Sequence, residues 1–436
     1  MSEIAELQNQ YVLTAWSKQR NLLPPAIVRT EGIYLYDDAG KRYADMSSQL
    51  VNMNVGHGNK EIAEAIKEQA DKYCYLAPSY ACEPRAKLAE KLIAHLPDNF
   101  GKIFFTLCGS DANENALVIA KMVSGRNKIF SRYRSYHGSN FGAGNLTGEP
   151  RRFPLEPGIP GFVKFFDPYL YRAPFAFATE EEATAYYIAQ LREQIYYEGP
   201  DQIAAIFLES VTGSNGTIVP PKGYMQGVRA LCDEFGIFMV TDEVMMGFCR
   251  SGRFFCFENF DVKPDMVTFA KGVTCGYVPL GGVAVSSKIA AYFDDNALIA
   301  GLTYSGHPLA CAAGIATLDY YDRVDLAGQV AKKGIYFRQL LDALMKKHER
   351  IGEVRSIGLH GCIELVKDRA TKEPVVPYGS DPEGVMPAIL AALSKKGFRT
   401  YTHENLLLVC PPLIITEAQL EEEFAKLDET LTELGY

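Results

Sequence analysis

The sequence predicts an α/β protein with a large domain on a mostly parallel central sheet and a smaller α+β domain built from both termini. Two observations predict this fold class. Short, continuously apolar runs alternate with helical patterns through the middle of the chain, as in a sheet covered by helices on both faces. The chain also has 436 residues, of which 47% are hydrophobic. This is enough for a large core and a second, smaller domain.

Residues 1–55 are expected to form the N-terminal segment of the small domain. A helical opening is followed by a hairpin outside the main sheet, with strands at 33–36 and 42–46 around a turn at 38–41. From about residue 59 to residue 95 the apolar spacing predicts two helices.

Residues 56–314 are expected to form the large domain. Six apolar strands are predicted in it, at 103–107, 128–131, 204–208, 237–241, 266–269 and 282–285. The stretch 148–179 is rich in proline, glycine and aromatic residues without periodicity. It is interpreted as a long ordered excursion near a site.

Residues 315–436 are expected to complete the small domain. One long helical pattern runs from Pro308 to about Lys347. After it the sequence predicts strands at 354–357 and 359–366, a helix at 383–396, a strand pair within 398–409 and a capped helix at 416–434.

Composition excludes several classes of function. The chain has 44 basic and 53 acidic residues without a long run of either sign, which argues against nucleic acid and anionic membrane as partners. Its ten cysteines form no CxxC pair, so we expect reduced core thiols and neither disulfides nor a metal site. The acidic start and the lack of a long apolar stretch complete the expectation of a cytoplasmic protein.

Two strand ends carry the chemistry. Asp242 and Lys271 each follow an apolar run, where a parallel strand delivers its last side chain to a cleft. A buried amine becomes a nucleophile near neutral pH, and a buried carboxylate can hold a proton on a heteroaromatic nitrogen. Pyridoxal phosphate requires this combination of lysine and acid.

A phosphate site is expected where Gly109, Ser110 and Asp111 follow a strand and open a helix. Backbone amides and the helix dipole favour an anion there. Such a turn alone is more often an ordinary helix N-cap. Together with Asp242 and Lys271 it favours a phosphate.

Four more residues are candidates for contacts with the cofactor. Tyr136, followed by His137, comes just after a short strand and can lie flat against a ring. Val244, two residues past Asp242, is expected on the opposite face. Glu209 ends the neighbouring strand, either as a hydrogen-bonding partner of the acid or the substrate or as a solvated terminus.

Thr303 lies in a glycine-rich loop. It can donate to the phosphate, or belong to an ordinary turn before a helix that has Pro308 near its start.

These residues resemble the class III aminotransferases of fold type I over essentially the whole chain. Five motifs stand in the family's order: 109–114, 136–138, 242–244, 269–272 and 303–308. The resemblance implies that Lys271 carries pyridoxal 5'-phosphate as a Schiff base, that Asp242 binds the pyridine nitrogen and that Tyr136 and Val244 enclose the ring. Gly109 and Ser110 would bind the phosphate. Thr303 would reach the phosphate of the other subunit, which implies a homodimer.

Within the family the chain is most similar to the ω-amino acid branch. The similarity lies in segments 54–58, 131–138 and 411–416. It implies an ω-amino acid as the donor, with taurine as the first choice, and 2-oxoglutarate as the acceptor. Pyruvate as acceptor, and β-alanine, 4-aminobutyrate or a diamine as donor, remain alternatives.

Three positions depart from the family pattern. Met245 replaces a Gln that bonds the phenolic oxygen of the cofactor in many relatives. Ser214 stands where ornithine-type relatives carry a Glu that shields an Arg, which argues against that subgroup. Val51 is smaller than the Trp that many ω-transaminases place nearby, so a wider or differently shaped substrate pocket is expected.

The residue that binds the substrate's acidic group is not fixed by the sequence. His403 stands where relatives place a carboxylate-binding Arg, and Arg399 lies four residues earlier; the spacing does not decide between them. Arg151 and Arg152 are further candidates, although a solvated basic pair is the more common reading of such a sequence.

Other functions fit part of the pattern. The same fold supports aminomutases, racemases and decarboxylases, because the geometry around the cofactor decides which bond breaks. A non-catalytic scaffold that only binds the cofactor would not explain the presence of Lys271. An aldolase that uses a lysine Schiff base would not explain an acid at Asp242 that faces a pyridine nitrogen.

Overall fold

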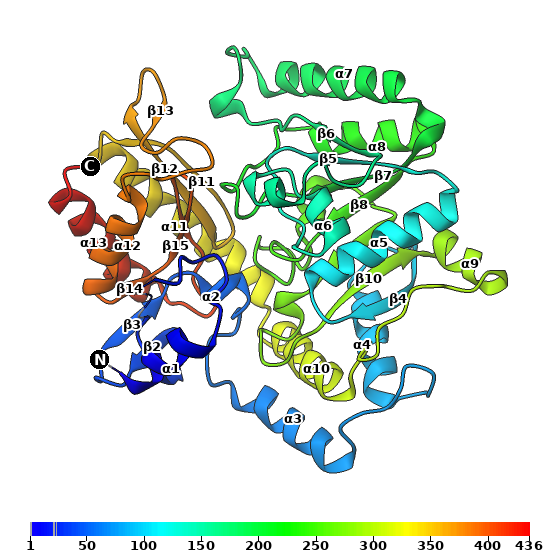
Figure 1. Cartoon of the computed structure of the whole chain (residues 1–436), viewed down its shortest axis with the longest axis horizontal. Coiled ribbons are helices and arrows are strands. Elements are labelled where there is room, and N and C mark those ends of the chain that lie inside the picture. The colour runs from blue at the N-terminus through cyan, green and yellow to red at the C-terminus, as the bar shows by residue number, and fades with distance from the viewer. Residues whose placement is uncertain (1, 21, 23) are drawn as a thin grey trace.

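The structure is a computed structural model that describes residues 2–20, 22 and 24–436. Figure 1 shows a seven-stranded sheet on one side of the molecule and two smaller sheets, with the chain termini, on the other. The predicted fold class, with its mostly parallel central sheet and smaller α+β part, is confirmed.

The seven-stranded sheet contains all six predicted strands. Its order is β4 (Phe100–Thr106), β10 (Gly281–Ser286), β9 (Met266–Phe269), β8 (Phe238–Asp242), β7 (Ile203–Glu209), β5 (Lys128–Arg132) and β6 (Phe162–Phe165). The last five run parallel, and β10 is antiparallel to both of its neighbours. β6 was not predicted, because this half-buried edge strand of four residues lies in the excursion without periodicity.

Helices cover this sheet. Of these, α5 (Gly109–Ser124) contributes small residues such as Ala112 and Ala116 to a buried apolar cluster that it shares with β7, β8, β9 and β10. It ends where Gly125 takes a left-handed conformation, φ 68°, which glycine adopts without a steric penalty. The other α-helices between residues 56 and 300 are α3 (Lys60–Lys72), α4 (Glu83–Ala94), α6 (Phe141–Leu146), α7 (Glu180–Glu198), α8 (Tyr224–Phe235) and α9 (Ser287–Asp295).

A second sheet joins the two ends of the chain. The order is β1 (Ile27–Glu31), β2 (Tyr34–Asp37), β3 (Arg42–Asp45) and β14 (Phe398–Arg399), and β14 lies parallel to β3. The predicted hairpin is present as β2 and β3, whereas β1 was not predicted. This pairing is consistent with a small domain made from both termini; the boundaries at residues 55 and 314 remain a prediction.

The third sheet belongs to the C-terminal part. It is formed by β11 (Ile351–Ile357), β12 (His360–Asp368), β16 (Leu406–Val409) and β15 (Tyr401–His403), with β13 (Glu373–Pro374) beside β12. Helices α12 (Val385–Lys395) and α13 (Glu417–Glu433) follow the predicted ranges. A capping box between Thr416 and Gln419 starts α13, as its sequence indicates.

The single long helix predicted after Pro308 is wrong. The structure has two helices, α10 (Pro308–Arg323) and α11 (Leu326–Lys347). Asp325 breaks the run with φ 47°, and its side chain accepts from Gly328 N to cap α11. Such a cap competes with helix continuation. The short helices α1 (Glu3–Tyr11) and α2 (Ser48–Val51) lie in the N-terminal segment.

All ten cysteines are free, and eight of them are buried. The expectation of core thiols is wrong for Cys74 and Cys108, which are exposed. Among the helices of residues 2–20, 22 and 24–436, none is long and apolar enough to cross a membrane.

Candidate active site

Three polar side chains stand in one row at the carboxyl edge of the large sheet. β7, β8 and β9 are adjacent and parallel, and their register pairs Glu209 with Asp242 and Asp242 with Thr268. Lys271 follows three residues after Thr268, with a left-handed φ of 48°. Parallel strands thus bring the predicted acid and lysine to the same edge. We call Glu209, Asp242, Thr268 and Lys271 the sheet-end row.

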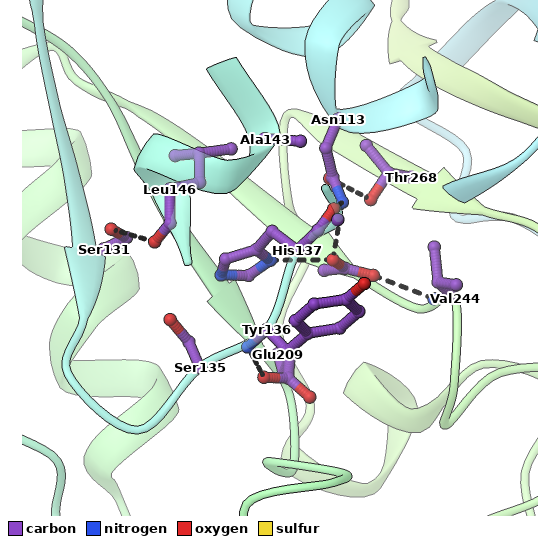
Figure 2. Close-up of polar contacts among 12 residues, drawn as sticks. Asn113, Ser131, Ser135, Tyr136, His137, Ala143, Leu146, Glu209, Val244 and Thr268 are labelled. Atoms are coloured by element: carbon purple, nitrogen blue, oxygen red, sulfur yellow. Dashed lines mark hydrogen bonds and ion pairs between the residues drawn. The ribbon is translucent and has the colours of Figure 1, made fainter. Parts of the chain in front are cut away.

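Asp242 is held by three donors. Its side chain is almost fully buried, Asn113 Nδ2 donates to Oδ2 at 2.8 Å, and His137 Nδ1 lies 2.7 Å from the same oxygen. Oδ1 accepts from Val244 N at 3.0 Å. Figure 2 shows Asn113, His137 and Val244 around this carboxylate. The carboxylate plane is therefore fixed.

Lys271 is suited to nucleophilic chemistry. Burial lowers the pKa of its amine from 10.5 to about 8, although the nearby carboxylates of Asp242 and Glu209 act in the opposite direction. At neutral pH a useful fraction of Lys271 is therefore uncharged, as covalent catalysis by lysine requires.

Glu209 is a hydrogen-bonding residue and not a solvated strand end. It is 4% exposed, Oε1 accepts from Tyr136 N at 3.2 Å, and Oε2 accepts from Gly213 N at 2.7 Å. Burial raises the pKa of Glu209, and the nearby charge of Asp242 raises it further. Glu209 thus ties the Tyr136 backbone to the sheet-end row.

The N-terminus of α5 forms a narrow cradle. A Cβ at Gly109 would lie 2.6 Å from Val244 Cγ1, and one at Gly138 would clash with the side chain and backbone of Ser110. Ser110 Oγ accepts from Asn140 N at 3.0 Å. Only glycine fits these two close approaches, and the first turn of the helix presents its amides there.

Asp111 lies at the rim of this cradle. Its Oδ1 accepts from Asn140 Nδ2 at 2.7 Å, which fixes the loop that follows Gly138. His137 lies deeper and is 2% exposed.

Tyr136 is covered by an arginine. Arg151 Cζ lies 3.8 Å from the centroid of the Tyr136 ring, a cation–π arrangement. Arg151 also pairs with the buried carboxylate of Glu149, and its Nη2 donates to Ser214 Oγ at 3.4 Å. The reading of Arg151 as one of a solvated pair is therefore wrong. Arg152 points elsewhere, since its Nε donates to Glu156 at 2.8 Å.

His403 joins the same group from the small domain. Its Nε2 lies 3.2 Å from Asn215 Oδ1 and 3.7 Å from Glu149 Oε2. Burial, together with the charges of Arg151 and Arg134, lowers the pKa of His403 to about 3. His403 is therefore neutral at physiological pH. We call Glu149, Arg151, Ser214, Asn215 and His403 the arginine cluster.

The remaining predicted residues, Arg399, Val51 and Thr303, are placed elsewhere. Arg399 Nη1 donates to Ser394 Oγ on α12 at 3.3 Å. Val51 is 2% exposed in an apolar cluster that Met245 and Tyr401 also contact. Thr303 is exposed, and its carbonyl accepts from Tyr75 OH at 2.8 Å.

The sequence reasoning missed Asn113, Thr268 and Glu149. Asn113 stands inside a recognised motif, and Thr268 is three residues before Lys271, so both positions were visible but no role was assigned. No sequence pattern marks Glu149 as a site residue, because it lies in the excursion 148–179, which lacks periodicity.

The site as a whole fits pyridoxal phosphate. A lysine with a lowered pKa and a fixed buried acid stand at neighbouring strand ends, and a glycine-lined helix N-terminus lies next to Val244. The fold and this donor set define a fold type I pyridoxal phosphate enzyme.

Comparison with known proteins identifies the family. A sequence profile described as aminotransferase class-III matches residues 15–431, so the chain belongs to the class III aminotransferases. It is 34% identical to taurine–pyruvate aminotransferase of Bilophila wadsworthia, covering 99% of this chain and 97% of that protein.

Two solved structures have the same fold. Taurine:2-oxoglutarate aminotransferase from Bifidobacterium kashiwanohense, in complex with PLP and glutamate, is 50% identical and has a TM-score of 0.97, covering 99% of this chain and 98% of that one. An (S)-enantioselective ω-transaminase from Thermomicrobium roseum is 36% identical with a TM-score of 0.95, at the same coverage.

Proposed function

We propose that this enzyme moves the amine of taurine to 2-oxoglutarate, giving sulfoacetaldehyde and L-glutamate. The observation that carries the chemistry is that Asp242 ends β8 and Lys271 closely follows the adjacent parallel strand β9, with a Lys271 pKa of about 8. The substrates are supported by a relative that is 50% identical over nearly the whole chain and is named for this reaction.

The cofactor would be held by residues of both walls of the site. Lys271 would bind it covalently, Asp242 would face the pyridine nitrogen, and Tyr136 and Val244 would cover the two faces of the ring. Gly109, Ser110 and Asp111 would bind the phosphate, with His137 and Glu209 supporting these contacts. When bound, pyridoxal phosphate supplies an electron sink for the charge that develops on the donor carbon.

Side chains of the site would then carry out the transfer of one proton. Released Lys271 is partly uncharged near neutral pH, so it can take the proton from the donor carbon and deliver it to the cofactor. Asp242, fixed by three donors, would keep the ring nitrogen protonated through this transfer. Glu209 would hold the Tyr136 backbone against the ring.

The arginine cluster would bind the acidic group of the substrate. The Arg151 guanidinium lies over Tyr136 and is paired with Glu149, and its planar fork suits a sulfonate or a carboxylate. Neutral His403 can add a hydrogen bond. Val51 and Met245 would form the apolar wall of the substrate pocket beside the arginine cluster.

A panel of substrates tests this proposal. Taurine, β-alanine, 4-aminobutyrate and a diamine are each offered with 2-oxoglutarate or pyruvate, and glutamate or alanine formation is measured. Taurine with 2-oxoglutarate should give the highest kcat/KM. Migration of the amine within the donor, or release of carbon dioxide, without transfer to either acceptor would instead indicate an aminomutase or a decarboxylase, and binding without any reaction would indicate a scaffold.

Pyruvate is the second candidate acceptor. It is supported by the 34% identical relative named taurine–pyruvate aminotransferase. Alanine formed faster than glutamate in the same panel would favour it.

We also propose a cytoplasmic homodimer in which Thr303 reaches the phosphate bound by the partner subunit. Thr303 is exposed beside Tyr304, a large aromatic side chain that is 55% exposed, as expected of a surface that another subunit covers. Light scattering decides between monomer, dimer and tetramer. A Thr303→Val dimer that binds the cofactor as tightly as the wild type would contradict the proposed role.

A further inference from the structure

One buried amide joins the parts of the site. Asn113 lies on α5, the helix that begins at the cradle, and is 1% exposed. Its Nδ2 donates to Asp242 Oδ2 and to the carbonyl of His137, both at 2.8 Å. Its Oδ1 accepts from Thr268 Oγ1 at 2.9 Å. Figure 2 shows these contacts among Asn113, His137 and Thr268.

The orientation of this amide is determined by its partners. Both hydrogens of Nδ2 are used, and Oδ1 faces the hydroxyl of Thr268. A rotation that exchanged Oδ1 and Nδ2 would turn an acceptor toward a carboxylate and a carbonyl, which repel it. Because Thr268 is fully buried, loss of its hydroxyl would leave Oδ1 without a donor at high cost.

The three contacts connect elements with different tasks. Asp242 ends β8, His137 follows the proposed ring-covering Tyr136, and Thr268 precedes the proposed attachment residue Lys271. The helix that carries Asn113 begins at the proposed phosphate cradle. Asn113 therefore fixes the separation between the phosphate end and the ring-nitrogen end of the site.

We propose that Asn113 is a positioning residue that orients the Asp242 carboxylate toward the ring nitrogen of the cofactor. Thr268 holds the side-chain amide of Asn113 in the orientation that this requires. This rests on the proposed use of pyridoxal phosphate. Asn113 acts through Asp242 and is not itself catalytic. Without its amide, Oδ2 of Asp242 keeps His137 as its donor, and α5 loses the side-chain hydrogen bond from Asn113 to the end of β8.

Isosteric substitutions test the proposal. Asn113→Asp keeps the shape but replaces the donor with an oxygen that faces Asp242. Thr268→Val removes the hydroxyl at nearly constant volume, whereas Thr268→Ser keeps it. Asn115→Asp is the matched control, because Asn115 is also buried on α5 but donates to the helix carbonyl of Asp111 at 2.7 Å.

Cofactor affinity is measured by equilibrium dialysis of the full-length protein. The dissociation constant of pyridoxal phosphate should rise about tenfold or more in Asn113→Asp, the size expected when a hydrogen bond to a charged group is lost. Thr268→Val should raise it about threefold to tenfold. Thr268→Ser and Asn115→Asp should stay within about twofold of the wild type, since both variants leave the hydrogen bond from Asn113 to Asp242 unchanged.

The pH dependence of the visible absorption separates positioning from support of the fold. In Asn113→Asp and Thr268→Val the midpoint of this titration should move, because the partner of the ring nitrogen has moved, while circular dichroism shows a folded protein. Thr268→Ser should restore the wild-type midpoint. A loss of thermal stability with an unchanged midpoint would overturn the proposal.

The two proposals fail in different ways. If Asn113→Asp and Thr268→Val bind the cofactor and titrate like the wild type, the positioning role is refuted while the proposed function stands. If the wild-type protein itself does not bind pyridoxal phosphate, the proposed function is refuted, and this inference falls with it.

Discussion

The sheet-end row and the arginine cluster are assembled in opposite ways. In the row, Glu209, Asp242 and Thr268 are paired in register at the ends of three neighbouring parallel strands. In the cluster, Arg151 from the large-domain excursion meets His403 from β15, more than two hundred residues later in the chain. The row depends on strand pairing, and the cluster depends on how the β15 segment packs against the excursion.

This difference separates two tasks. A rigid sheet fixes the groups that are proposed to hold the cofactor, because every strand end is set by its neighbours. Loops that meet across the site can change the shape of the arginine cluster, the proposed binding site for the substrate's acidic group, while the row stays in place. Mutations in the row should therefore reduce chemistry with every substrate, and mutations in the cluster should discriminate among substrates.

The largest effect is expected in the sheet-end row. Lys271→Ala should lower kcat about a thousandfold or more with all donors, since both the attachment point and the base are lost. Single-turnover kinetics with taurine and β-alanine measure it. As a control, Lys164→Met removes another lysine whose pKa is lowered, to about 7, by burial; its hydrogen bonds run to Ser131 and Leu146. An equal loss of kcat in Lys271→Ala and Lys164→Met would contradict the proposal that Lys271 acts through its place in the sheet-end row.

The next effect concerns the arginine cluster. Arg151→Gln should raise the KM for taurine and for 2-oxoglutarate about tenfold to a hundredfold, because a charge-assisted contact is lost. An amine donor without an acidic group should be much less affected. Steady-state kinetics measure both KM values. In the matched variant Arg152→Gln they should stay near those of the wild type, since Arg152 pairs with Glu156. A similar loss with the neutral amine would contradict a role in anion binding.

The third effect is a pH dependence of cofactor capture. In the folded protein, burial is the main cause that lowers the pKa of Lys271 to about 8. Below that pH, the fraction of Lys271 in the neutral amine form increases about tenfold for each pH unit. The rate of covalent reconstitution should rise with pH and level off above pH 8. Stopped-flow absorbance measures it. An increase that continues toward pH 10, as for an ordinary lysine, would refute the lowered pKa.

The smallest effect separates two candidates that the spacing left undecided. His403→Ala should raise the KM for 2-oxoglutarate a few-fold, about threefold to tenfold, through loss of a neutral hydrogen bond. Arg399→Ala should change KM by less than about twofold, because its guanidinium lies against Ser394 on α12. The reverse order of effects in initial-rate measurements would place Arg399, and not His403, at the substrate.

Much of the sheet-end row could be predicted from sequence. Continuous apolar runs identify β7, β8 and β9, and the residues that end them follow at once. Asn113 could not be assigned, because its role depends on three partners that come from separate elements. The break at Asp325 was missed for a related reason: a left-handed residue inside a helical pattern leaves the periodicity intact.

Local periodicity and the residues at element ends are enough to predict the strands, the order of the motifs and the combination of an acid with a lysine. Which charged side chains come into contact depends instead on tertiary packing. The packing of β15 and the excursion turns Arg151 onto Tyr136, buries Glu149 beneath it and leaves Arg399 outside. Burial then lowers the pKa of Lys271. Desolvation and contacts between distant segments exist only once the chain is folded, so the sequence alone could not supply them.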